Sequence, residues 1–92
     1  MIRSFRSGEA RRIFEGQRSK RFANLQHIIE RKLQLLDSAS MLGDLSSPPN
    51  NRLEALKGDR KGQHSIRVND QYRLCFRWTS EGPEDVDLVD YH

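Results

Sequence analysis

Several residue patterns that common enzyme classes require are missing from this sequence. Cys75 is the one cysteine among 92 residues, which excludes an internal disulfide and a site built from several cysteines. Its place in the middle of a predicted strand favours a buried thiol over a nucleophile. There is no Walker-type glycine loop, and no histidine pair or carboxylate cluster has the spacing of a metal site. We therefore expect neither a metal nor another cofactor.

Long apolar segments are missing as well. No run approaches the roughly 20 apolar residues of a membrane span, and the arginine-rich N-terminus lacks the apolar centre of a signal peptide. These absences, together with the single cysteine, predict a cytoplasmic protein that does not contact a membrane. The length predicts one domain over residues 1–92, with room for one sheet and one or two helices.

What the sequence does contain is charge that is unevenly distributed. The net charge is +3, from 16 Lys and Arg against 13 Asp and Glu. Nine basic residues lie in 1–33 and seven in 52–77, whereas 78–92 holds five acidic residues and no basic one. Basic surfaces favour nucleic acid, because contacts to phosphates release counterions. A solvated surface of mixed charge is the alternative that charge alone leaves open.

Apolar spacing predicts an α+β fold. Apolar residues recur at intervals of three and four in 8–15 and 22–38, which predicts two helices. Residues 1–6 alternate like an edge or first strand, and residues 52–57 alternate like a later one. A connector with two prolines, 46–51, separates the helices from the later strands. The expected order is β-α-α-β-β-β.

The last third of the chain reads as a hairpin followed by a final strand at 85–90. The hairpin pairs 63–68 with 72–78 across a turn that contains Asn69 and Asp70. Side chains of a strand alternate between the two faces of a sheet. One face is therefore apolar, with Ile66, Val68, Tyr72, Leu74, Phe76 and Trp78, and we expect it to cover the core. The other face holds Ser65, Arg67, Arg73, Cys75 and Arg77, and we expect the Arg73 charge to face a ligand.

Two groups of residues are candidates for chemistry. One is the cationic set Arg52, Lys57, Arg60, Lys61, Arg67, Arg73 and Arg77; the other is the triplet Asp90-Tyr91-His92. A ribonuclease that uses no metal needs a base for the ribose 2′-hydroxyl, an acid for the 5′-oxygen and cations for the phosphorane. Histidine and carboxylate suit the first two roles, and arginine and lysine the third. Ordinary surface pairing of the arginines and a frayed chain end are the alternatives.

Three motifs resemble the HigB toxins of bacterial toxin–antitoxin modules, the "plasmid maintenance killer protein" branch of the RelE-like superfamily. They are Lys57-Gly58-Asp59-Arg60 after Leu53 and Leu56, the run from Gly62 to Asp70 that contains His64-Ser65-Ile66-Arg67-Val68, and the end Asp90-Tyr91-His92. The resemblance covers nearly the whole chain. It implies one RelE-like domain, in which a small, mainly antiparallel sheet packs against two N-terminal helices.

The resemblance also implies a function. Members of the family are ribosome-dependent endoribonucleases that cut translated mRNA without a metal, and their partner is a helix-turn-helix antitoxin. Operator DNA is then contacted only through the antitoxin. Asp90, Tyr91 and His92 fall on the family's catalytic end, and Arg73 and Lys57 fall on its cationic positions. Glu54 stands where some relatives carry a histidine, so it is a further catalytic candidate.

The remaining cationic residues and one histidine are assigned to RNA binding: Arg52, Arg60, Lys61, His64, Arg67 and Arg77. The leading hypothesis is an mRNA-cleaving toxin. A non-catalytic protein that binds RNA or the ribosome and blocks translation or ribosome assembly is the alternative, because the same basic sheet would serve it. A co-regulator whose essential contact is with the antitoxin is a third hypothesis.

Overall fold

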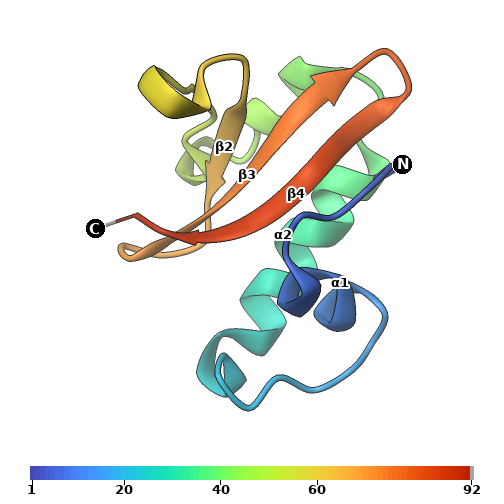
Figure 1. Ribbon diagram of the computed structural model, residues 1–92, viewed down its shortest axis with the longest axis vertical. Helices are drawn as coiled ribbons and strands as arrows, with labels where there is room; N and C mark the ends of the chain where they lie inside the picture. The colour runs from blue at the N-terminus through green and yellow to red at the C-terminus, as the bar shows by residue number, and fades with distance from the viewer. Residues whose placement is uncertain (92) are drawn as a thin grey trace.

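The structure of the protein is a computed structural model, in which residues 1–91 are described. Two helices, α1 (Gly8–Phe14) and α2 (Gln26–Ser38), precede a four-stranded antiparallel sheet with the strand order β1-β2-β3-β4. The strands are β1 (Glu54–Ala55), β2 (His64–Arg67), β3 (Tyr72–Thr79) and β4 (Gly82–Asp90). Figure 1 shows both helices behind and below the long β3–β4 hairpin. Within the described chain neither helix is long and apolar enough to cross a bilayer.

Local structure explains where α1 begins and ends and where α2 begins. Ser7 caps α1, because its hydroxyl oxygen accepts a hydrogen bond of 3.1 Å from the Ala10 backbone N–H. Gly16 follows α1 with φ of +92°, a left-handed conformation that suits glycine. The second helix begins at Gln26 rather than at residue 22, because residues 23–25 form a tighter 3-10 turn, η1, that leads into it.

The hydrophobic core lies between α2 and one face of the sheet. Ile29, Leu33 and Leu36 of α2 are fully buried. They belong to one apolar cluster with residues that alternate along the strands: Ile66, Val68, Leu74, Phe76 and Val86. The apolar face predicted from the hairpin pattern is thus confirmed as the core-facing one. Burial of this apolar surface is the main term that favours folding, at about 25 cal/mol per Å².

The N-terminal segment forms less of a strand than its pattern predicts. Phe5 makes a single parallel bridge to Val86, so residues 1–6 follow the outer edge of β4 without becoming a full strand (Figure 1). The approach is close at Gly82, where a Cβ atom would lie 2.2 Å from the Met1 carbonyl oxygen. Only glycine fits there. The strand β4 begins at this residue rather than at residue 85, because Gly82 and Pro83 already pair with Thr79 and Trp78 of β3.

The predicted strand at 52–57 is also shorter in the structure, where β1 is limited to Glu54–Ala55. Residues Pro49–Asn51 form a 3-10 turn, η3, and Arg52 follows it in the left-handed region with φ of 47°. A residue in that conformation cannot continue a strand. Leu56 is buried while Glu54 is exposed, so the two side chains do not continue one face of a strand.

These differences change the element order but not the fold class. Four strands follow the two helices, and the N-terminal segment adds one isolated bridge instead of a strand. The α+β class and the small antiparallel sheet against two N-terminal helices are confirmed.

Candidate functional site

Arg73 lies on the sheet face that points away from the helices, near the end of the sheet where β3 begins. Its side chain is 7% exposed, and its Nε donates to the Ser65 hydroxyl at 2.7 Å. A terminal nitrogen of the same guanidinium donates to the backbone carbonyl of Arg52 and lies 3.8 Å from a carboxylate oxygen of Glu54. The guanidinium carbon stands 5.3 Å from the centre of the Tyr91 ring. Arg73 therefore lies on the predicted face, but it is enclosed there instead of facing solvent.

The three arginines predicted for this face have different surroundings. Arg67 lies directly opposite Arg73 in the β2–β3 ladder, and two like charges at such positions repel. The repulsion is relieved because the Arg67 guanidinium turns to the Asp70 carboxylate in the β2–β3 turn. Arg77 is exposed, and its guanidinium lies against Gly62. The three thus do not form one uniform cationic surface.

Buried polar contacts fix the position of the Arg52 carbonyl, which accepts from Arg73. Arg52 follows Asn51, whose side chain is fully buried and donates to the backbone carbonyls of Leu45 at 3.2 Å and Ser47 at 3.1 Å. The amide oxygen of Asn51 accepts from the buried Lys32 ammonium of α2. Burial lowers the pKa of Lys32 below its ordinary value, and nearby positive charges add to this effect. A polar chain therefore runs from α2 to the Arg73 site.

The chain end meets this site at the last residues of β4. The Tyr91 backbone N–H donates to the Gln71 carbonyl at 2.6 Å, and Gln71 Nε2 donates to Asp90 at 3.1 Å. The turn between β2 and β3 thus positions the end of the chain. The Tyr91 ring is 47% exposed, with one side over the Arg73 guanidinium. His92 was predicted to be catalytic and lies outside the described residues.

Among the other catalytic candidates, Glu54 is brought to the Arg73 site and Lys57 lies three residues beyond it. The Glu54 side chain is 51% exposed, so its carboxylate is open to a ligand while it is paired with Arg73. Glu54 is opposite Ser65 in the β1–β2 ladder, which explains its place beside the arginine. Lys57 is exposed at the start of the 3-10 turn η4 (Gly58–Arg60).

The residues predicted to bind RNA are divided between two faces. His64 projects to the core side, where its ring stacks on Phe76 with 6.3 Å between centroids. It is therefore not brought beside Glu54, since the Ala55–His64 pair and the Glu54–Ser65 pair point to opposite faces. Arg60 lies on the Arg73 side and forms an ion pair of 3.3 Å with Asp87. Arg52 and Lys61 are exposed.

Two residues of the site were not predicted. Ser65 accepts a hydrogen bond from the Arg73 guanidinium, and Asn51 holds the turn that precedes Arg52. Both Ser65 and Asn51 are fully buried. A signal for Ser65 was present, because it lies diagonally from Arg73 in the hairpin register. No comparable signal existed for Asn51 in a proline-rich connector. Cys75, also on this face, is buried, and burial raises the pKa of its thiol, as expected of a thiol that is not a nucleophile.

Comparison with known proteins shows which family the chain belongs to. The family model for the RelE-like toxin HigB of type II toxin–antitoxin systems matches residues 3–92. The chain belongs to the HigB-like toxin family. It is therefore the toxin of a type II toxin–antitoxin module, and an antitoxin is its partner.

Individual relatives agree with this assignment. Toxin HigB-1 of Vibrio cholerae is 50% identical over 56 residues, which span 61% of this chain and 59% of that toxin. Endoribonuclease HigB of Proteus vulgaris is 33% identical over 93 residues, which cover all of both chains. An uncharacterized protein of Haemophilus influenzae is 42% identical over 70 residues, 76% of this chain and 69% of its own length. The full-length match includes the Arg73 site and the chain end.

Proposed function

We propose that this HigB-like toxin is an endoribonuclease that cuts mRNA on the translating ribosome and so inhibits translation. The ribose 2′-hydroxyl attacks the adjacent phosphorus, and no metal takes part. The name of its full-length relative states endoribonuclease activity. The observation that carries the proposal is the enclosed Arg73, held between Ser65, the Arg52 carbonyl and Glu54 beneath an exposed Tyr91 ring.

Each part of this arrangement suits one requirement of RNA cleavage. The Tyr91 ring offers a stacking surface for a base, and the guanidinium beneath it orders the ring by a cation–π contact. A fixed positive charge beside that surface stabilises the anionic phosphorane without having to reorganise during the reaction. Exposed Lys57, Arg52 and Lys61 supply further cations for phosphates.

The proton transfers are assigned to the remaining catalytic candidates. Glu54 or Asp90 accepts the proton of the 2′-hydroxyl, and His92 donates a proton to the leaving 5′-oxygen. The bond from phosphorus to the 5′-oxygen breaks as the bond to the 2′-oxygen forms. The products are a 2′,3′-cyclic phosphate, or the 3′-phosphate formed from it, and a 5′-hydroxyl.

The test compares the full-length protein, a deletion of His92 and Glu54→Gln on ribosomes programmed with a defined message. Components are treated with a chelator and then restored to the magnesium that ribosomes need. We expect site-specific cuts with a 5′-hydroxyl from the full-length protein, and a large loss of rate for the deletion of His92. A large loss for Glu54→Gln would assign the base to Glu54, and an unchanged rate would assign it to Asp90. Ribosome stalling without cleaved message would assign the protein to the non-catalytic alternative. A 3′-hydroxyl product would exclude attack by the 2′-oxygen.

The partner in this proposal is a helix-turn-helix antitoxin that contacts the basic N-terminal region. Operator DNA is then reached only through the antitoxin. Arg11 and Arg12 are exposed on α1, away in sequence from the chain end, and acidic antitoxin side chains would complement them. Reversing both charges should slow association at low salt. Unchanged association would place the antitoxin contact elsewhere.

A further inference from the structure

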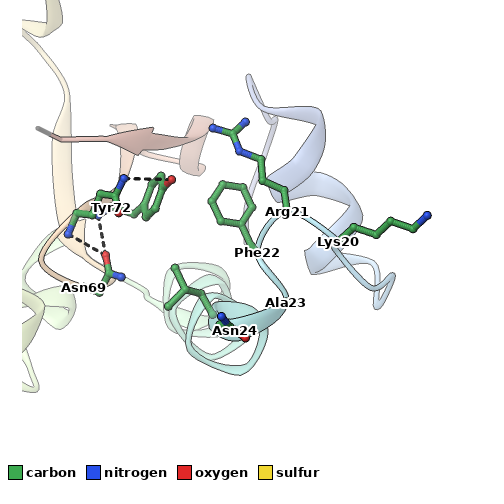
Figure 2. Close-up of a pocket in the computed structure, with 9 residues that line it drawn as sticks. Lys20, Arg21, Phe22, Ala23, Asn24, Asn69 and Tyr72 are labelled. Atoms are coloured by element: carbon green, nitrogen blue, oxygen red, sulfur yellow. Dashed lines mark hydrogen bonds between the residues drawn. The ribbon is translucent and has the colours of Figure 1, made fainter.

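A pocket lies beside the β2–β3 turn, the same turn that contacts the last described residues of the chain. It has a volume of about 310 Å³ and lies between residues 20–25, which lead into α2, and the turn that carries Asn69, Gln71 and Tyr72 (Figure 2). These two segments are far apart in sequence, so only the tertiary fold creates the pocket. Its size is at the lower end for small-ligand sites in proteins.

One wall of the pocket is aromatic and carries a cation. The Tyr72 ring packs edge-to-face on the Phe22 ring, with 5.1 Å between centroids and 89° between planes. The Arg21 guanidinium carbon lies 4.9 Å from the centre of the Phe22 ring. Figure 2 shows Arg21 above this ring, whereas Lys20 extends away from the pocket. Arg21 is therefore the cation placed at the aromatic wall.

The opposite wall offers amides. The Asn69 side-chain oxygen accepts from the backbone N–H groups of Gln71 at 2.9 Å and Tyr72 at 2.7 Å, which fixes the turn. The Asn69 amide nitrogen takes no part in these two bonds. Asn24 also lines the pocket, and it is exposed. Aromatic rings, amides and an arginine together are the groups that proteins use to bind unpaired nucleotides. A carboxylate ligand would satisfy Arg21 but would leave the rings and amides without partners.

Gln71 connects the pocket to the chain end. Its side-chain nitrogen lies 3.4 Å from the Tyr72 hydroxyl and 3.1 Å from an Asp90 oxygen, and its carbonyl accepts from the Tyr91 backbone. An RNA strand stacked on Tyr91 can therefore continue into the pocket. We propose that the pocket binds one unpaired nucleotide of the message next to the cleaved segment, with its base against the Tyr72–Phe22 wall and its phosphate at Arg21. This inference rests on the proposed function.

The first experiment measures cleavage kinetics on programmed ribosomes at several salt concentrations. Arg21→Ala should raise KM about tenfold and leave kcat unchanged, because it removes binding and not chemistry. It should also lower the slope of log KM against log salt by about one, the value expected for one lost phosphate contact. Arg18→Ala is the matched control, because Arg18 is an exposed cation of the same region that does not line the pocket. Thermal unfolding of all three proteins should coincide.

Three outcomes would overturn the inference, the third of which also requires a measurement of antitoxin binding. A KM of Arg21→Ala equal to that of the full-length protein would remove the phosphate contact. Equal effects of Arg21→Ala and Arg18→Ala would indicate diffuse attraction and no pocket. An Arg21→Ala protein that binds the antitoxin more weakly but cleaves normally would assign the pocket to the antitoxin instead.

A second experiment separates failure of the inference from failure of the proposed function. A message that contains 4-thiouridine and a 2′-deoxyribose at the cut position is irradiated with the protein on ribosomes, and the crosslinked peptides are mapped. Crosslinks to 20–25 or 69–72 support the pocket even if the full-length protein never cleaves. Crosslinks confined to other segments, or formed with ribosomal RNA alone, overturn it.

Discussion

Both faces of the sheet contain buried side chains, but these are buried for different reasons. On the helix-covered face, Leu74 and Phe76 are enclosed by other apolar side chains. On the opposite face, Ser65 and Arg73 are enclosed by hydrogen bonds and by the Tyr91 ring. Apolar contacts have little directional preference, whereas hydrogen bonds to a guanidinium require defined geometry. The first face therefore provides stability, and the second fixes the orientation of one charged group.

The difference shows how a small protein can hold a charged arginine inside its fold. Burial of an arginine without partners would be very unfavourable, and Arg73 has several. Its bonding depends on the turn at Arg52, which depends in turn on Asn51 and Lys32. We therefore expect substitutions on the apolar face to reduce folding stability. Substitutions on the polar face should reduce the cleavage rate by more than they reduce stability.

The largest effect on stability is expected from Phe76→Ala. This side chain is fully buried in the apolar cluster, and such truncations cost about 3–5 kcal/mol. Urea unfolding followed by circular dichroism measures the loss. Cleavage per folded molecule should remain near that of the full-length protein. A loss below 1 kcal/mol would show that this face is not the main source of stability.

Arg73→Ala should produce the largest effect on cleavage. Loss of a fixed cation near the phosphorane is worth about 3 kcal/mol, or roughly two decades in rate. Because Arg73 is enclosed, the variant should also lose about 1–3 kcal/mol of stability as its former acceptors stay buried.

Arg73→Lys is the matched variant, since it keeps the charge and loses the planar fork of donors. This variant should fold like the full-length protein, but it should cleave RNA poorly. Full activity of Arg73→Lys would mean that charge alone suffices and that the geometry of this face is unimportant.

A smaller effect is expected beneath the site, at the pair of Lys32 and Asn51. Asn51→Leu alone leaves a buried ammonium and two carbonyls without their partner, at a cost of about 3 kcal/mol. Adding Lys32→Met should recover the part of that loss that comes from the unpaired ammonium, because an apolar group then replaces the buried charge. A double-mutant cycle in urea measures the coupling. Simple additivity of the two changes would contradict the proposed connection.

The smallest effect is a pH dependence of stability. Burial lowers the pKa of Lys32 from its ordinary 10.5. Between the lowered pKa and 10.5 the unfolded chain binds more protons than the folded chain, so the free energy of unfolding contributed by Lys32 rises with pH. The stability of the full-length protein relative to Lys32→Met should therefore increase across that window. A constant difference would show that the ammonium is not penalised by burial.

Much of the fold could be predicted because it depends on local patterns. The apolar residues of α2 recur with helical spacing, and Leu74 alternates with Arg73 along β3. The HigB family could also be recognised from its motifs. The chain-end residues Asp90 and Tyr91 were predicted to belong to one site with Arg73, and the structure places Tyr91 over that arginine. The roles of these residues in cleavage remain predictions until the variants are measured.

Contacts between distant segments depended on the tertiary structure alone. Alternation assigns Arg73 to a face but does not say what covers that face, so its enclosure by Tyr91 and the Arg52 carbonyl could not be foreseen. The left-handed Arg52 follows Asn51, which accepts a hydrogen bond from Lys32, nineteen residues earlier. The pocket of Arg21 and Tyr72 likewise joins two segments that share no sequence pattern. Periodicity is a property of neighbouring residues, whereas these contacts depend on how the whole chain packs.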